Sequence, residues 1–326
     1  MPNHIADREW TLFAESEGYE RNYLKDADLI RRLERPGCPV DVVIDTDTFN
    51  EIDDQYALAY LIKSNDKLRL KAIYAAPFFN NKSSSPEDGM LKSHAEIMKI
   101  LTLMEREDLK EIVFTGSRSY MLDEHTPVYS QAAQDLATRA MTYSTEKPLY
   151  VVAIGAITNI ASALIAAPAI RDRIVLIWLG GHALEWPNNR EFNLMQDVAG
   201  ARVVFGCGVP LVQLPCMGVV SSFQTTGPEL EYHLRGKNRL CDYLIDVTTR
   251  EALTCGGNST WSRPLWDVTA VAWLLDEGFM QDRLVHVPVP EYDHRYALSQ
   301  YTHLYKYVYH IDRDRLFEDL FKKLCN

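Results

Sequence analysis

Short apolar runs rich in Val, Ile, Leu and Tyr alternate along the chain with stretches whose apolar residues recur at helical spacing. Eight runs have the length and composition of β-strands: residues 40–46, 68–76, 111–116, 149–156, 173–181, 209–215, 283–289 and 305–311. Helical spacing is clearest between the first five, at residues 53–64, 91–105, 130–144 and 158–168. Such alternation predicts an α/β fold in which helices cover both faces of a mostly parallel sheet of about eight strands.

The residues before the first strand differ from the rest of the chain. Segment 1–38 is polar, lacks the basic start and apolar core of a signal peptide, and ends at Pro36 and Gly37, which stop a helix. We expect a helical extension over residues 1–38 and a single Rossmann-like, doubly wound catalytic domain over 39–326. No run of about 18 apolar residues occurs, so we expect no membrane partner and a cytoplasmic location.

Charge and cysteine content narrow the function classes. The 34 Lys and Arg against 45 Asp and Glu give a formal charge of −11, which repels a phosphate backbone and suits neutral or cationic ligands. Nucleic acid is therefore not an expected partner. The 6 cysteines lie far apart without a C-x-x-C pair, which predicts scattered reduced thiols and neither a zinc site nor a disulfide framework.

One stretch, VVIDTDTFNEIDDQYALAY at residues 42–60, concentrates negative charge directly after a strand. It holds Glu51 and four aspartates, at positions 45, 47, 53 and 54. Ligands bind at the carboxyl ends of strands in such sheets. Asn50 is a candidate N-cap for the following helix, with Asp53 three residues later, which accounts for one or two carboxylates.

The remaining carboxylates need a positive neighbour. Asp45 and Asp47 share a face of the strand, and two carboxylates about 4 Å apart repel by roughly 4 kcal/mol at an effective dielectric of 20. A shared proton, a distant Lys or Arg, or a hard cation would relieve this. Calcium suits a loop rich in oxygen ligands and free of His and Cys. An EF-hand is excluded because Asn50 and Tyr56 stand where it needs Gly and Glu.

The strand followed by DTDTFNEIDDQYALA resembles the aspartate motif of the nucleoside hydrolase family, calcium-dependent enzymes that cleave the N-glycosidic bond of ribonucleosides. Three further segments resemble family motifs in the same order: GAITNIASAL at 155–164, REFNLMQDVAGARVVF at 190–205 and PLWDVTAVAWLL at 264–275. The chain departs from the family in one turn, where TFNEI is two residues longer than usual and the usual glycine is missing.

The resemblance implies a role for each matching residue. The resemblance implies that Asp47, Asp54, Asp267 and the carbonyl of Thr158 coordinate calcium. It also implies that Asp47 is the general base. It assigns ribose binding to Asp53, Asn193, Glu191 and Asn80, with Asn81 as the less favoured alternative to Asn80. Asp45 would support the loop through hydrogen bonds. Because calcium would chelate both ribose hydroxyls, 2′-deoxyribonucleosides are expected to be poor substrates. Family members are usually dimers or tetramers, which implies a homo-oligomer.

The leaving base also needs assistance. In the pyrimidine-tolerant and broad-specificity branch a histidine precedes the last aspartate, whereas this chain has Trp266. A tryptophan there resembles the purine-preferring branch, in which stacking on the base assists its departure. Candidates for a second ring are Trp186, Tyr120, Tyr129 and Phe79, and His182 is an alternative proton donor.

Other interpretations stay open at this stage. Thr158 and Asp267 fit helix caps, Glu191 and Asn193 fit loop polar residues, and Trp266 fits core packing. We predict a hydrolase of purine ribonucleosides, with hydrolysis of another N-glycoside by the same mechanism as a variant. One alternative is a calcium-dependent nucleoside or sugar binding protein without turnover. Another is a haloacid dehalogenase-type phosphatase, which Phe49 and the nearby second acidic pair disfavour.

Overall fold

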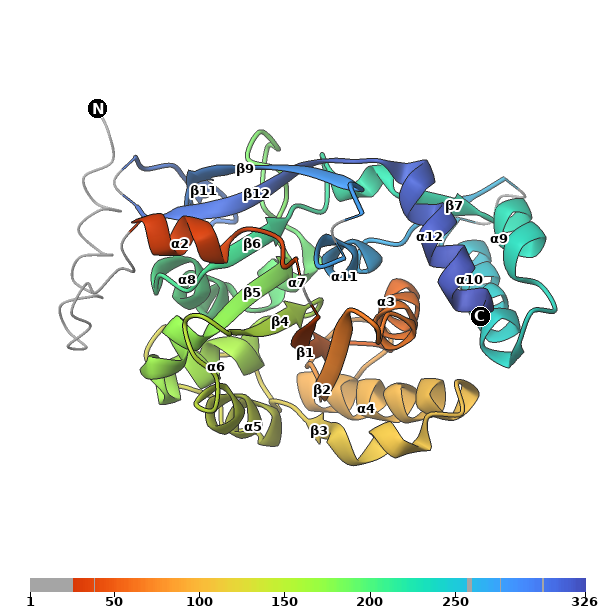
Figure 1. Ribbon diagram of the computed structural model, residues 1–326, viewed down its shortest axis with the longest axis horizontal. Helices are drawn as coiled ribbons and strands as arrows, with labels where there is room; N and C mark the ends of the chain where they lie inside the picture. Colours follow the sequence, from red (N-terminus) through yellow and green to blue (C-terminus); the bar gives the residue numbers. More distant parts are fainter. Residues whose placement is uncertain (1–25, 38, 257–259, 276, 301) are drawn as a thin grey trace.

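The computed structural model describes residues 26–326 except 38, 257–259, 276 and 301 (Figure 1). An eight-stranded sheet forms its centre, in the order β3-β2-β1-β4-β5-β6-β12-β9. The strands are β1 (Val40–Thr46), β2 (Leu68–Ala75), β3 (Val113–Thr115), β4 (Leu149–Ala153), β5 (Ile174–Leu179), β6 (Leu211–Leu214), β9 (Met280–His286) and β12 (Leu304–Ile311). Each predicted strand contributes to it, and only β9 runs antiparallel to its neighbour. The predicted mostly parallel α/β sheet is therefore confirmed.

Each face of the sheet carries its own hydrophobic core, because successive strand residues point to opposite faces. Val42 and Ile44 enter one core, while Val43 between them enters the other. The helices of the first core include α3 (Asp53–Lys63), α4 (Pro86–Leu103), α11 (Val268–Trp273) and α12 (Arg313–Cys325). Those of the second include α5 (Gln131–Ala140), α6 (Thr158–Ala166) and α8 (Val198–Gly206). This arrangement is doubly wound, as predicted.

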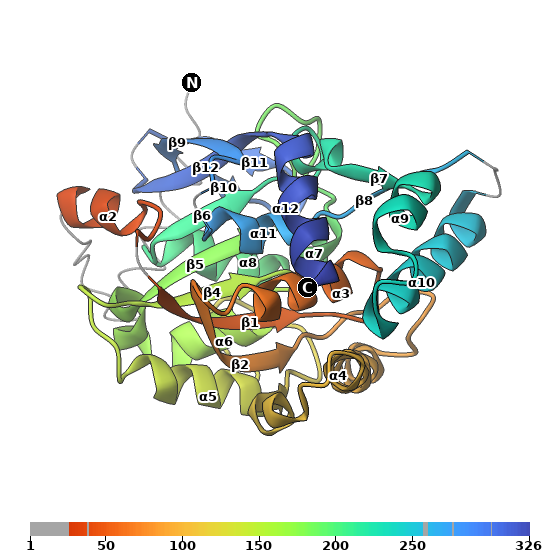
Figure 2. The same cartoon turned by 45° about the vertical axis from the view of Figure 1, so that its right-hand side comes forward.

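The predicted extension over residues 1–38 lies partly outside the described residues, which begin at residue 26 and omit residue 38. Its described part forms α2 (Asp26–Arg32). Leu29 and Leu33 are buried in the first core, and the Arg32 guanidinium donates a 2.7 Å hydrogen bond to the carbonyl of Ile174 at the start of β5. Burial lowers the pKa of Arg32 to about 10. This part of the extension is thus packed against the amino end of the sheet (Figure 2).

The described residues between 217 and 263 fold at the opposite end of the molecule (Figure 2). They form a 3₁₀ turn (Val220–Ser222), β7 (Gln224–Thr226), α9 (Gly227–Leu234), α10 (Arg239–Gly256) and β8 (Ser262–Pro264). Strands β7 and β8 pair antiparallel in a small separate sheet. Because β8 leads directly into α11, this segment brings Asp267 next to the start of α3, where its backbone amide bonds to Asp53.

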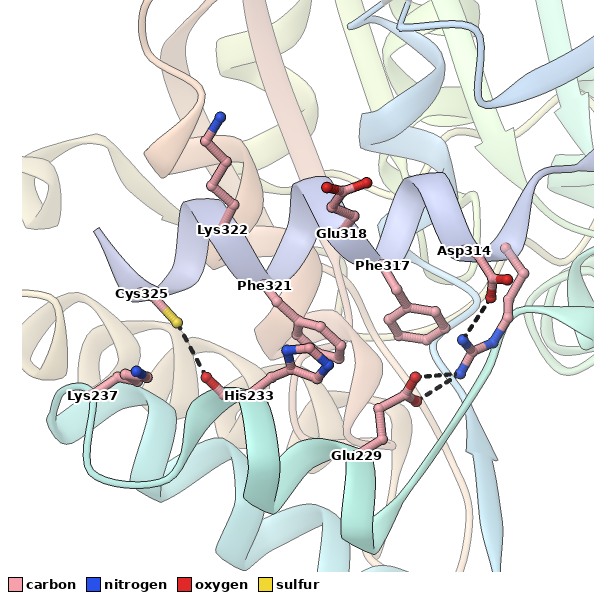
Figure 3. A pocket seen from close by; sticks show the side chains of 10 residues that line it. Glu229, His233, Lys237, Asp314, Phe317, Glu318, Phe321, Lys322 and Cys325 are labelled. Carbon is pink, nitrogen blue, oxygen red and sulfur yellow. Dashed lines mark hydrogen bonds and ion pairs between the residues drawn. The ribbon is translucent and has the colours of Figure 1, made fainter.

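Helices α9 and α12 enclose a cavity of about 590 Å³ (Figure 3). His233 on α9 stacks against Phe321 on α12, with ring centroids 4.6 Å apart, and Arg313 pairs with Glu229 at 2.6 Å. None of the predicted site residues lines this cavity. Four of the cysteines are described, and each is free: Cys207, Cys216, Cys241 and Cys325. Within the described residues no helix is long and apolar enough to cross a membrane.

Candidate active site

The acidic stretch lies at the point where the strand order changes direction. From β1 the chain adds β2 and β3 on one side, then returns to place β4 on the other side. The loops after β1 and β4 therefore diverge and leave a crevice at the carboxyl end of the sheet, where open α/β sheets bind ligands. Residues 47–52 form the first of these loops, and α6 begins with Thr158 just after the second.

Three carboxylates converge in this crevice. Asp53, Asp54 and Asp267 each offer an oxygen, and these oxygens lie within 4.8 Å of one another. Asp53 and Asp54 form the first turn of α3, where the helix dipole favours negative charge. Thr46 donates its hydroxyl to Asp54. Burial and the neighbouring carboxylates raise the pKa of Asp53 and Asp267 well above the ordinary value, and burial raises that of Asp54 to about 6.

Asp47 adds a fourth carboxylate to the same cavity. Its side chain is 1% exposed, and its Oδ2 is buried without a hydrogen-bond partner. Burial, followed by the charge of Asp54, raises its pKa well above the ordinary value. A buried carboxylate oxygen without a partner is costly, and oxygen-rich, His-free surroundings suit a hard cation. The buried carboxylate oxygens therefore fit a hard metal cation at this place.

Asp45 is fully buried but is not among the residues that line the cavity. Its Oδ1 accepts a 2.7 Å hydrogen bond from the side-chain amide of Asn159. Burial raises its pKa to about 7. This placement agrees with the supporting role expected for Asp45.

The predicted N-cap at Asn50 is wrong. The residue preceding α3 is Ile52, and no side chain caps the helix. The backbone N–H of Asn50 donates a hydrogen bond to the Asp47 carbonyl at 2.7 Å, so the chain turns before the helix begins. The side-chain oxygen of Asn50 then accepts a 2.7 Å hydrogen bond from Asn80. Capping therefore does not explain the acidity of the loop.

Thr158 and Asp267 do not cap their helices either. The Thr158 hydroxyl donates a 2.5 Å hydrogen bond to Asp197, a carboxylate that sequence reasoning missed. Asp197 also accepts the amides of Gly200 at 2.7 Å and Met121 at 3.2 Å, so it ties the start of α6 to α8. Asp267 precedes α11, yet its side chain makes no capping hydrogen bond. The capping alternatives for both residues are thus excluded.

Glu191 and Asn193 are buried and line the cavity, so they are not surface loop residues. The Glu191 carboxylate accepts three backbone amides, from Gly181 at 2.8 Å, Asn193 at 2.9 Å and Leu194 at 2.8 Å, at the start of α7 (Phe192–Gln196). Burial raises its pKa to about 7. The side-chain nitrogen Nδ2 of Asn193 donates a hydrogen bond to the Leu179 carbonyl at 3.0 Å. Both side chains are therefore held rigidly.

Asn80 and His182 do not line the cavity. Asn80 is engaged with its own loop and supports Asn50, and Asn81 is exposed. The Nδ1 of His182 accepts the Met217 amide at 3.2 Å, and burial lowers its pKa to about 4. Both residues were predicted to contact the substrate, but the spacing of residues in a sequence does not determine which way loop side chains point.

Aromatic side chains reach the cavity from two segments. Trp266 lines it, and its indole Nε1 is buried without a partner. Phe192 also lines it, although sequence reasoning did not select this residue from the Glu-Phe-Asn motif. None of the four candidates for a second ring lines the cavity: Trp186, Tyr120, Tyr129 and Phe79. The core-packing interpretation of Trp266 is therefore incomplete, because one part of the side chain packs and another faces the cavity.

The cavity itself is small and acidic. Its volume is about 80 Å³, well below the roughly 300 Å³ at which pockets for drug-sized ligands begin. A nucleoside-sized ligand must therefore extend past the rim or displace it. The lining residues are Asp47, Asn50, Glu51, Asp53, Asp54, Ile154, Leu179, Glu191, Phe192, Asn193, Cys216, Trp266 and Asp267. Asn50 and Glu51 belong to the longer TFNEI turn, so this departure in sequence shapes the site directly.

The geometry can be compared with known proteins. The family description of inosine-uridine preferring nucleoside hydrolases matches residues 42–318. The pyrimidine-specific ribonucleoside hydrolase RihA of Salmonella enteritidis is 25% identical over 263 residues, covering 72% of this chain and 79% of RihA. Among solved structures, a plant nucleoside hydrolase, PpNRh1, matches with a TM-score of 0.71 at 20% identity, covering 88% of this chain and 99% of its own.

A second solved structure has a different stated preference. The purine-preferring ribonucleoside hydrolase from Gardnerella vaginalis matches with a TM-score of 0.71 at 18% identity, covering 87% of this chain and 98% of its own. At this low sequence identity, the similarity to the two solved structures shows a shared fold. The names of two of these relatives state opposite base preferences, pyrimidine for RihA and purine for the Gardnerella enzyme.

Proposed function

The chain belongs to the family of inosine-uridine preferring nucleoside hydrolases, and we propose that it hydrolyses the N-glycosidic bond of purine ribonucleosides in the acidic cavity. The observation that carries this proposal is the convergence of Asp53, Asp54 and Asp267, which no helix cap explains. The matched range, residues 42–318, includes all four motifs on which the resemblance was based.

Calcium is the proposed cofactor. Asp47, Asp54, Asp267 and the carbonyl of Thr158 would hold it, and Asp197 fixes the side chain of Thr158. When bound, the ion would lower the pKa of a coordinated water and orient the ribose hydroxyls. The Oδ2 atom of Asp47 has no hydrogen-bond partner, which supports this assignment because this oxygen can coordinate a metal ion or accept a proton.

The side chains supply the remaining chemistry. Asp47 accepts a proton from the water that attacks the anomeric carbon, so it acts as general base. Asp53 and Asn193 accept hydrogen bonds from ribose hydroxyls, and Glu191 faces the far end of the sugar. Glu191 has about one acceptor position left, since three backbone amides occupy the others. The nearby carboxylates stabilise the positive charge that develops on the sugar.

A purine is the proposed base because Trp266 and Phe192 offer ring surfaces at the cavity, and a purine has the larger face for stacking. His182 lies outside the cavity and is neutral near pH 7, so its assignment to substrate binding finds no support in its position. We place the enzyme in the cytoplasm as a homodimer or homotetramer, by its family resemblance. Size-exclusion chromatography with light scattering measures the oligomer.

A nucleoside panel tests the proposal. Release of reducing sugar is measured for inosine, adenosine, guanosine, uridine and cytidine, each with calcium and with excess chelator. We expect the purine ribonucleosides to be cleaved fastest and the chelator to stop turnover. The 2′-deoxy analogues should react at least ~100-fold more slowly, because site groups that bind the missing hydroxyl are left unpaired. Binding of nucleosides without release of sugar would instead identify a binding protein.

A further inference from the structure

Glu51 places a carboxylate at the mouth of the cavity. Its side chain is 37% exposed, and it lines the cavity together with the buried acids. Asp47, Asp53, Asp54 and Glu191 line the same cavity, so the Glu51 carboxylate shares it with four other acidic side chains.

The cation closest to Glu51 stays outside the cavity. Arg263 on β8 approaches the Glu51 carboxylate only to 3.7 Å and does not line the cavity. Lys82 is held by the Asn50 carbonyl at 2.7 Å and by Glu251 at 3.0 Å. The mouth of the cavity therefore keeps an acidic group that a ligand can reach.

The lining as a whole has a surplus of negative charge. Six acidic side chains line the cavity and, among the described residues that line it, there is no Lys, Arg or His. One divalent cation offsets two of these charges. The surplus repels an anionic ligand and attracts a cationic one, and a low-dielectric wall strengthens both effects.

Among the described residues that line the cavity there is no His, the side chain that most often protonates a leaving group, and the indole of Trp266 is not an acid. The buried carboxylates of the lining are already assigned to the metal, to the ribose and to the attacking water. A neutral base needs a proton as it leaves, whereas a base with a positive charge does not. When the bond between its ring nitrogen and the anomeric carbon breaks, the bonding pair neutralises the ring. Water supplies the hydroxyl of the sugar, and its proton passes through Asp47 to solvent.

We propose that this site selects ribosides whose heteroaromatic base carries a positive charge, and that Glu51 is the residue that discriminates them from neutral ribosides. The proposal rests on the proposed function and names its preferred substrate class. Trp266 adds to it, because a cationic ring is attracted to the face of an aromatic side chain. Among neutral ribosides the purine preference is unaffected.

The test compares two single-ring ribosides, 1-(β-D-ribofuranosyl)pyridinium and uridine, with calcium at pH 8 and low salt. The value of kcat/KM is measured for both in the wild type, in Glu51→Gln and in Glu251→Gln. Glu251 is the matched control, because its carboxylate pairs with Lys82 and does not line the cavity. Any intrinsic difference in reactivity between the two ribosides cancels when their ratio is compared between variants.

We expect the wild type to favour the pyridinium riboside and Glu51→Gln to lower the ratio by about tenfold, as loss of one partly screened charge predicts. Glu251→Gln should keep the wild-type ratio. In the wild type alone, raising the salt concentration should slow the pyridinium riboside more than uridine. An unchanged ratio in Glu51→Gln, or preference for uridine, overturns the proposal while leaving nucleoside hydrolysis intact. If no riboside releases sugar, the proposed function itself fails.

Discussion

The backbone amide of Asp267 donates a hydrogen bond to Oδ2 of Asp53 at 3.2 Å, across 214 residues of sequence. This bond joins the start of α11 to the start of α3 and places the Asp267 side chain beside Asp54. Two helix N-termini therefore meet at the carboxylates, and their dipoles offset part of the repulsion. The acidic group is thus built into the packing of the two helices.

Calcium should stabilise the folded protein measurably. A ligand that binds only the folded state at 100 times its Kd contributes about 2.7 kcal/mol, and differential scanning fluorimetry with calcium or with chelator reports it as a rise in Tm. Asp267→Asn should abolish the rise, while its chelated form should be at least as stable as the wild type, since one buried like charge is removed. An equal rise in the variant would exclude Asp267 as a ligand.

Asp47 should be indispensable for turnover. Replacement of a general base typically lowers the rate by about 10² to 10⁴, and Asp47 is also a proposed ligand. We therefore expect Asp47→Ala to lower kcat for inosine by at least ~10³ and to weaken calcium binding in a calorimetric titration. Asp45→Asn is the comparison, because Asp45 does not line the cavity. Near-normal activity of Asp47→Ala would rule out both roles.

The sequence was sufficient to predict the architecture. The strands are nearly continuous apolar runs because helices cover both faces of the sheet. Their carboxyl ends share one edge, so loops distant in sequence meet there. This is why four residues from distant segments line the same cavity: Asp54, Glu191, Asn193 and Asp267.

The details that were missed depend on local hydrogen bonds and on the directions of side chains. Asn50 was assigned to the helix, but the longer turn lets it bond with Asn80 instead. Glu51 and Phe192 were not selected, although both stood inside quoted motifs. The contact of Thr158 with Asp197 spans 39 residues and has no periodic signature. Such features follow from tertiary packing, which propensity and spacing do not encode.

The hydroxyl of Thr158 should position the loop that carries its carbonyl. Thr158→Val keeps the shape but removes the donor to Asp197, whereas Thr158→Ser keeps the donor. We expect the valine variant to lose about 1 to 2 kcal/mol of stability and to bind calcium about tenfold more weakly by titration calorimetry. The serine variant should retain wild-type affinity. Equal calcium affinity in the wild type and both variants would show that the Thr158 hydroxyl does not influence metal binding.

Glu191 should make the stability of the chelated protein depend on pH. Burial raises its pKa from 4.5 to about 7, so between these values the folded protein holds a proton that the unfolded chain has released. The stabilisation is complete below about pH 4.5 and is lost as the pH rises through about 7, and for this group the loss amounts to about 3 kcal/mol. Urea unfolding at pH 5 and pH 8 measures this loss.

Two variants separate Glu191 from the rest of the site. Other buried carboxylates act in the same direction, so the wild type should lose more than this amount. Glu191→Gln has no such proton to release, and its loss should be smaller by about 3 kcal/mol. Glu87 is the comparison, because its side chain is 45% exposed and does not line the cavity; Glu87→Gln should behave as the wild type does. Equal losses in all three proteins would show that Glu191 is already ionised at pH 5 and that its three amide hydrogen bonds outweigh the effect of burial.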